Sequence, residues 1–220
     1  MVFSTIIFLL RFLPITLALY YLAPPKLKNT VLFLCSLVFY CWGEVRFFPV
    51  MLALILINYL CGLGLERFDR NRTARLVLLL IALAGSLGML FYFKYANFVL
   101  SSLNALFGTS FASIPGISVL PLGISFFTVQ SVGYAVDVYR KKYAAEPSAC
   151  NFALFVSFFP LISSGPIMRG DKLLPQLRAP RALRTDRAAH ALVTFALGLF
   201  SKVAVADLLA VFANAVYGDV

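Results

Sequence analysis

Long runs of apolar residues alternate with short polar stretches along the whole chain. A membrane-spanning helix needs about 20 mainly apolar residues, and several runs approach that length. Segments of about ten residues with strict alternation, which are typical of outer-membrane barrels, are not seen. The pattern therefore predicts an all-α protein with about six to eight membrane-associated helices. The expected segments are Phe3–Ala23, Val31–Trp42, Phe47–Leu65, Leu76–Phe93, Phe98–Phe111 as an interfacial helix, Ile117–Val138, Asn151–Met168 and Ala188–Tyr217.

Composition supports a membrane environment. Of the 220 residues, 61% are hydrophobic and 13% are charged, whereas soluble domains average about 25% charged residues. Disorder requires low hydrophobicity and is excluded. A net charge of +10 would suggest nucleic acid in a soluble chain, but in a membrane chain it marks cytoplasmic loops and anionic lipid. We therefore expect the lipid bilayer as a partner and no nucleic acid.

The distribution of Lys and Arg predicts the orientation. Fifteen of the 19 basic residues fall in four loops, which leaves Arg11, Arg46, Lys94 and Lys202 elsewhere. Cytoplasmic loops carry the excess of Lys and Arg, so these four loops are expected inside and the amino terminus outside. Both flanks of residues 151–168 are then cytoplasmic, which predicts one re-entrant segment. Its Pro160, Gly165 and Pro166 fit broken backbone that protein or a wet cavity must satisfy. A Pro-kinked ordinary span is the alternative.

One predicted helix carries a polar stripe. Gln130, Tyr134, Asp137 and Lys141 follow at i, i+4, i+7 and i+11 and so share one helix face. Amides and carboxylates within a membrane turn towards the bundle interior or a wet cavity. The plainer alternative is that Gln130 and Tyr134 bond neighbouring helices while Asp137 pairs with a basic residue at 140 or 141.

A second polar group follows the break at Pro160. Ser163, Ser164 and Arg169 stand beside Gly165 and Pro166, and an Arg there can bind a phosphate or carboxylate through two hydrogen bonds. Snorkelling of Arg169 to lipid headgroups is the alternative. The basic run from Arg169 to Arg187 could attract an anionic cytosolic donor such as a thioester of coenzyme A, or serve orientation and lipid contact only.

The remaining polar residues carry weaker signals. Lys202 and Asp207 are five positions apart, so on a straight helix they face different directions and each needs a partner elsewhere. The single histidine, His190, has no orienting partner nearby in the sequence and is expected to be an interfacial polar residue. The four cysteines are expected to be buried apolar groups, and neither a metal site nor a bound cofactor is expected.

Several segments together resemble the membrane-bound O-acyltransferase (MBOAT) family, in its bacterial alginate O-acetyltransferase branch. They are Phe91–Phe98, Leu120–Ser131, Tyr134–Arg140, Phe159–Arg169 and Gly198–Asp207, and they occur in order along the chain. The resemblance implies a multi-span helical protein with a polar passage, through which an acyl group from a cytosolic donor such as acetyl-CoA reaches the outer face. It also implies partner proteins there that acetylate an exported polysaccharide, and a bacterial inner-membrane location. As passage residues we predict Ser125, Gln130, Tyr134, Asp137, Ser163, Ser164 and Arg169.

The sequence departs from the family at its catalytic centre. The family's catalytic histidine, usually in Trp-His-Gly, lies in a C-terminal half that has no counterpart here, and His190 does not occupy its place. We therefore expect residues 1–220 to be the N-terminal part of a single membrane domain, inactive alone, with the histidine beyond Val220. The alternatives are a membrane transporter or export subunit, which also uses broken helices, and a non-catalytic scaffold.

Overall fold

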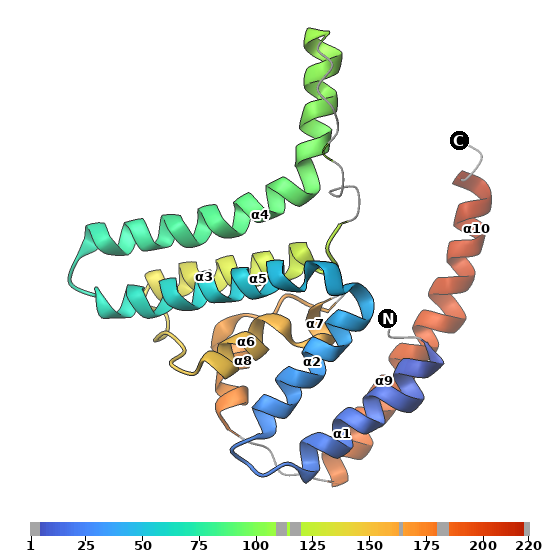
Figure 1. The fold of residues 1–220 in the computed structure, drawn as a ribbon. Coiled ribbons are helices and arrows are strands. Elements are labelled where there is room, and N and C mark those ends of the chain that lie inside the picture. Colours follow the sequence, from blue (N-terminus) through green and yellow to red (C-terminus); the bar gives the residue numbers. More distant parts are fainter. Residues whose placement is uncertain (1–4, 109–113, 115–119, 163–164, 180–184, 218–220) are drawn as a thin grey trace. The chain divides into compact units, whose positions relative to one another are not determined.

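The computed structural model describes residues 5–108, 114, 120–162, 165–179 and 185–217. Every regular element in these ranges is a helix (Figure 1), which confirms the all-α prediction. The chain divides into two compact units. One unit comprises Ala23–Pro180, and the other comprises Met1–Leu22 together with Arg181–Val220.

The first unit begins with two separate apolar helices. Helix α2 (Lys28–Glu44) starts shortly after Pro24 and Pro25, and α3 (Phe48–Arg67) carries a proline in its first turn, where no backbone donor is needed. Between them, the 3-10 turn η2 (Val45–Phe47) follows Glu44, whose backbone is extended. The predicted segments Val31–Trp42 and Phe47–Leu65 correspond to these helices.

Helix α4 (Arg72–Phe107) corrects one prediction. The 36-residue helix joins the predicted span Leu76–Phe93 to the described part of the predicted interfacial helix Phe98–Phe111. No Gly or Pro lies between these two segments, so nothing in the backbone ends the helix there. Asn71 caps its start by accepting from the N–H of Ala74 at 3.0 Å, and Gly108, with φ +62°, ends it in the left-handed region.

Helix α5 (Ile124–Tyr139) is shorter than the predicted span Ile117–Val138, of which residues 117–119 lie outside the described ranges. Its start is fixed by Gly123, which has φ +71°. A Cβ at Gly123 would also lie 2.0 Å from the carbonyl oxygen of Ile162, so only glycine fits. This close approach joins the start of α5 to the broken segment.

The predicted break near Pro160 is confirmed. Helix α6 (Ala149–Ser157) ends before Phe158, the short α7 (Phe159–Ile162) follows, and α8 (Gly170–Arg178) begins after residues 165–169, which are not helical. The freed N–H of Phe159 donates to the hydroxyl of Ser36 in α2 at 3.3 Å. Protein groups therefore satisfy the broken backbone, as membrane depth requires. That the segment enters and leaves on one side stays a prediction.

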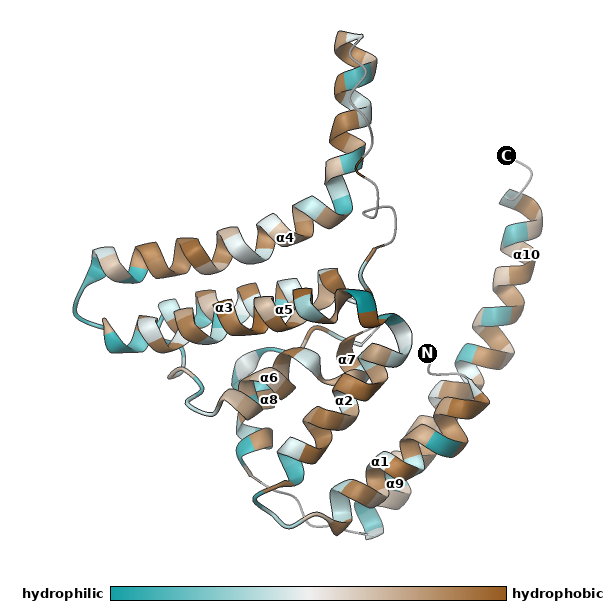
Figure 2. Cartoon of the chain, in the orientation of Figure 1, coloured by the Kyte–Doolittle hydropathy of each residue, from teal (hydrophilic) through white to brown (hydrophobic). Residues whose placement is uncertain are grey.

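Two groups of helices form the core of this unit. Helices α3, α4 and α5 pack against one another around Cys61, Leu79, Ala82 and Ala135. Helix α6, whose residues 152–157 are all buried, packs against α2 and α8. Figure 2 shows apolar residues along these helices and hydrophilic residues at the turn between α3 and α4.

The second unit contains two helical segments with π-helical turns. The first comprises η1 (Phe8–Phe12), which holds Arg11, and α1 (Leu13–Leu22). The other runs without a break through α9 (Thr185–Phe200), η3 (Ser201–Ala206) and α10 (Asp207–Tyr217).

The pairing of Lys202 and Asp207 corrects the prediction that each needs a distant partner. The Lys202 Nζ lies 2.6 Å from the Asp207 Oδ2. A π-helical turn closes hydrogen bonds between residues five apart, and so brings i and i+5 onto one face. The local π-turn, which the straight-helix argument did not include, therefore makes the pair.

Within the described residues, three helical stretches are long and apolar enough to cross a membrane: Lys28–Arg67, Arg72–Phe107 and Thr185–Tyr217. The last of these has no buried residue in its most apolar window. An apolar helix exposed in this way fits contact with lipid or with further membrane helices. The multi-span membrane character predicted from the sequence is confirmed.

Candidate functional site

Three residues of the predicted polar stripe are buried on α5, whereas Lys141 lies beyond the end of this helix and is exposed. The exposed fractions of Gln130, Tyr134 and Asp137 are 4%, 1% and 8%. Gln130 Nε2 donates to the carbonyl of Phe155 in α6 at 2.7 Å. The stripe therefore faces protein, and at Gln130 it connects α5 to the neighbouring helix, as the plainer alternative expected.

Asp137 finds a partner that the sequence did not indicate. Its Oδ1 accepts from Lys142 Nζ at 2.5 Å, whereas position 140 or 141 was expected. The reason is the end of α5, where the N–H of Lys142 donates to the carbonyl of Asp137 at 3.0 Å. The chain thereby folds back and brings Lys142 over the carboxylate, while Lys141 turns away to Asp69.

Tyr143 brings the two predicted polar groups together. Its ring lies 6.1 Å from that of Tyr134, and its hydroxyl lies against Gly170, where an added Cβ would be 2.2 Å away. The pKa of the Tyr143 hydroxyl is raised, first by burial and then by the charge of Asp137, while Arg169 acts in the opposite direction. We call the five residues Tyr134, Asp137, Tyr143, Arg169 and Gly170 the Tyr143 junction.

The Tyr143 hydroxyl is buried and has no hydrogen-bond partner among the described residues. A buried polar group without a partner costs about 1–3 kcal/mol, so such groups mark places where a ligand or water completes the bonding. Because Arg169 is exposed and its charge acts on the Tyr143 hydroxyl, the junction combines a buried hydroxyl with an accessible cation. That combination suits a polar or anionic acyl donor.

The other predicted site residues have different surroundings. Arg169 immediately precedes α8 and pairs with Asp171, with 3.1 Å between Nη2 and Oδ2. Ser125 lies half-buried in the first turn of α5. Ser163 and Ser164 lie outside the described residues.

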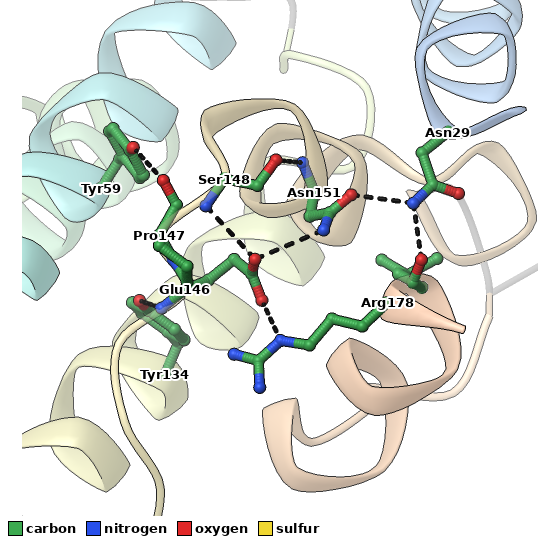
Figure 3. Close-up of polar contacts among 9 residues, drawn as sticks. Asn29, Tyr59, Tyr134, Glu146, Pro147, Ser148, Asn151 and Arg178 are labelled. Carbon is green, nitrogen blue, oxygen red and sulfur yellow. Dashed lines mark hydrogen bonds and ion pairs between the residues drawn. The ribbon is translucent and has the colours of Figure 1, made fainter. Parts of the chain in front are cut away.

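A buried carboxylate that the sequence did not single out organises the loop before α6 (Figure 3). Glu146, whose side chain is 1% exposed, accepts from Arg178 Nε at 2.8 Å. It also accepts from the N–H of Ser148 and the Nδ2 of Asn151, both at 3.3 Å. Its own N–H donates to the Tyr134 hydroxyl at 2.9 Å. The network therefore ties α5, α6 and α8 together beside the Tyr143 junction.

The network extends to α2 and borders a cavity. Asn29 Nδ2 donates to Asn151 Oδ1 at 2.8 Å and to the carbonyl of Leu177 at 2.6 Å. The cavity of about 360 Å³ is lined by Lys26, Asn29, Asn151 and Arg178, among others. Two cations and two amides make this a polar cavity. Glu146 could have been identified from the sequence, because it stands between apolar segments and directly before Pro147 and the helix-capping Ser148.

Metal ligands do not gather in the described part of the chain, where no three His, Cys, Asp or Glu side chains are placed to hold an ion. His190 is exposed on α9. The four cysteines are free; Cys61 is buried as expected, whereas Cys35, Cys41 and Cys150 are only half-buried, which corrects the prediction for these three.

Comparison with known proteins finds relatives along nearly the whole chain. The chain is 38% identical over 217 residues to a probable alginate O-acetylase AlgI of Pseudomonas aeruginosa. This alignment covers 97% of this chain and 41% of that protein. A probable alginate O-acetylase AlgI of Azotobacter vinelandii is also 38% identical, over 97% of this chain and 43% of that protein. A peptidoglycan O-acetyltransferase of Helicobacter pylori is 31% identical, in an alignment that covers 97% of this chain and 46% of that protein.

No family model and no solved structure matches the chain. The chain spans less than half the length of the curated relatives that it matches. The resemblance to the alginate O-acetyltransferase branch that the sequence motifs indicated is confirmed.

Proposed function

We propose that this chain is the N-terminal part of a membrane-bound O-acyltransferase that transfers acetyl groups to an exported polysaccharide. The observation that carries this proposal is the identity of 38% along 97% of the chain to proteins named alginate O-acetylases. The more distant match to a peptidoglycan O-acetyltransferase supports O-acetyl transfer in general rather than one polymer. The broken, protein-satisfied segment at Phe158–Pro160 fits a membrane protein that holds polar groups at depth.

In this proposal the Tyr143 junction forms part of the passage for the acyl group. Arg169 attracts the anionic end of a donor such as acetyl-CoA, because a guanidinium can donate two parallel bonds to a phosphate or carboxylate. The unpartnered hydroxyl of Tyr143 then donates to the acyl carbonyl. Removal of water by the surrounding buried rings strengthens that bond. The catalytic histidine is expected in the portion of the relatives that this chain does not cover.

The setting of the enzyme follows from the charge distribution. The loops rich in Lys and Arg, including the loop that holds Tyr143, face the cytoplasm, and the amino terminus faces outside. The protein resides in the bacterial inner membrane. Partner proteins at the outer face complete the transfer to the polysaccharide.

The orientation has a direct test. In a cysteine-free background, Ala144→Cys should resist an impermeant thiol reagent applied outside the cell, whereas Arg46→Cys should react. Both positions are exposed, so folding does not hide either thiol. Labelling of Ala144→Cys from outside would overturn the proposed orientation.

The role of Arg169 is tested in the complete natural protein, expressed in a host that lacks its own polysaccharide acetylase. We expect Arg169→Ala to abolish acetylation, measured as acetate released from the purified polysaccharide, while membrane insertion stays normal. The exposed Arg169–Asp171 pair contributes at most about 1 kcal/mol to folding, so unfolding does not explain such a loss.

Lys172→Ala is the matched control. Lys172 is an exposed cation in the first turn of α8, three residues after Arg169, and its side chain makes no hydrogen bond or ion pair within the described residues. This variant should keep normal acetylation. Unchanged acetylation in Arg169→Ala, or equal losses in both variants, would refute the role of Arg169.

A further inference from the structure

The turn between α3 and α4 forms a strongly basic site with the end of α5. A cavity of about 230 Å³ is lined by Asp69, Arg70, Arg72, Arg75 and Tyr139. An adjoining cavity of about 390 Å³ shares Asp69 and Arg75 and adds Lys141. We call these six residues the basic turn site, and Figure 2 shows the hydrophilic turn that carries it.

Asp69 is the carboxylate that contacts the cations of this site, and Glu66 and Tyr143 also line the larger cavity, so two carboxylates face four cations. Asp69 Oδ1 lies 2.9 Å from Arg75 Nη1 and 2.5 Å from Lys141 Nζ. The hydrogen bond from Lys141, together with the charges of Lys141, Arg75 and Arg70, holds the pKa of the Asp69 carboxyl below its ordinary value. Arg70 and Arg72 make no hydrogen bond or ion pair within the described ranges. The site therefore has excess positive charge.

An unsatisfied donor on Arg75 is a second indication that the site lacks a ligand. Its side chain is 9% exposed, and Nη2 donates to the carbonyl of Tyr139 at 2.5 Å. Its Nε is buried without a partner among the described residues. A buried charged donor without an acceptor is costly, and an anion in the adjoining cavity would supply one.

Lys141 occupies a backbone position that favours glycine. The N–H of Lys141 donates to Val138 and the N–H of Lys142 to Asp137, which is the Schellman ending of α5. Lys141 lies at its left-handed position, with φ +57°, the only non-glycine residue with positive φ in the described structure. That backbone costs about 1–2 kcal/mol, whereas an exposed ion pair typically returns less than about 1 kcal/mol. The ion pair therefore does not offset the backbone cost of a non-glycine residue at this position.

An apolar stripe runs from the basic turn site along α4. Leu76 and Leu80 follow Arg72 at i+4 and i+8, on the same helix face, and are 45% and 54% exposed. A cation at the end of an exposed apolar stripe matches a lipid, whose phosphate meets the arginines while its chains follow the helix. A soluble phosphate compound would leave the stripe uncovered.

We propose that the basic turn site binds the headgroup phosphate of an anionic phospholipid. Arg70 and Arg72 contact the phosphate, and Asp69 is the internal anion that competes with it for Arg75 and Lys141. The acyl chains lie along Leu76 and Leu80. This binding goes beyond the proposed acetyl transfer and does not depend on it.

The test measures lipid affinity of the complete natural protein by native mass spectrometry, with phosphatidylglycerol as the probe and phosphatidylcholine as the neutral reference. We expect Arg72→Gln to weaken phosphatidylglycerol binding about fivefold, the effect of about 1 kcal/mol for one cation near the phosphate. Arg140→Gln is the matched control, because Arg140 is an exposed cation between Tyr139 and Lys141 in the sequence but lines neither cavity. It should change affinity by much less.

Asp69→Asn should change the affinity for phosphatidylglycerol in the opposite direction. Removal of the internal anion frees Arg75 and Lys141, so affinity for phosphatidylglycerol should rise by a similar factor. Unfolding cannot produce a gain in affinity, which keeps the test decisive. Equal losses in Arg72→Gln and Arg140→Gln, or no gain in Asp69→Asn, would overturn the proposal. Displacement of phosphatidylglycerol by equimolar coenzyme A would overturn the lipid assignment and identify a site for a soluble phosphate donor.

Discussion

The ion pair between Glu146 and Arg178 should respond very differently to loss of either partner. The Glu146 side chain is 1% exposed and that of Arg178 is 47% exposed. Arg178→Gln leaves a buried carboxylate without its counter-charge, which costs about 3–5 kcal/mol for a buried pair. We expect the lower end, about 3 kcal/mol, because Ser148 and Asn151 still donate to Glu146. Glu146→Gln leaves an arginine that water can solvate, at about 1 kcal/mol.

The double variant provides a stricter test of this prediction. With both residues changed to Gln no buried charge remains, so Glu146→Gln should restore part of the stability that Arg178→Gln removes. The assay is unfolding of the complete protein in detergent, followed for the native protein, both single variants and the double variant. Equal losses in the single variants, or a double variant less stable than Arg178→Gln, would refute the reasoning.

Three further predictions concern other parts of the fold. Gly170→Ala should lower the unfolding free energy by about 1–3 kcal/mol through overpacking, whereas Gly133→Ala, with open space around the added Cβ, should be neutral or stabilising in unfolding measurements. The pKa of Asp69 is lowered in the folded protein, so its carboxylate stabilises the fold above about pH 4. This stabilisation is lost as the pH falls through the pKa of Asp69 in the folded state. The difference in unfolding temperature between the native protein and Asp69→Asn should therefore disappear towards about pH 2. In the apolar helix around Lys202 and Asp207, Lys202→Met with Asp207→Met should insert better than either single change in a membrane-insertion assay, since no unpaired charge remains.

The helices could be predicted from the sequence where breakers mark their ends. Pro24 and Pro25 lie just before α2, whereas the predicted segment Phe98–Phe111 continued past Gly108, where the structure ends α4. The long helix α4 was divided wrongly because a drop in apolarity after Phe93 was taken as an end. Polarity alone does not end a helix, since the backbone bonds continue unless a Gly, Pro or cap interrupts them.

The polar contacts were harder to predict than the helices. Burial of Gln130, Tyr134 and Asp137 followed from helical spacing and from the cost of polar groups facing lipid. Partners such as Lys142 for Asp137 depend on how a loop folds back, which periodicity does not describe. The Lys202–Asp207 pair depends on a π-turn, which ordinary helical spacing does not describe.

Glu146 is a polar loop residue whose contacts could not be predicted from the sequence. Its bond to Arg178 spans 32 positions and could not be deduced from spacing. Tyr143 was missed for a related reason, because its position against Gly170 arises from the packing of α8 on the loop. Both residues belong to segments that connect helices, where sequence periodicity is absent.

The measurement that tests the central claim most directly is the acetyl content of exported polysaccharide. A bacterial strain that lacks its own acetylase is complemented with the complete natural protein containing this chain. We expect that export is unchanged and that acetyl groups appear on the polymer. Normal export without any acetylation, or polymer export that itself depends on this protein, would contradict it.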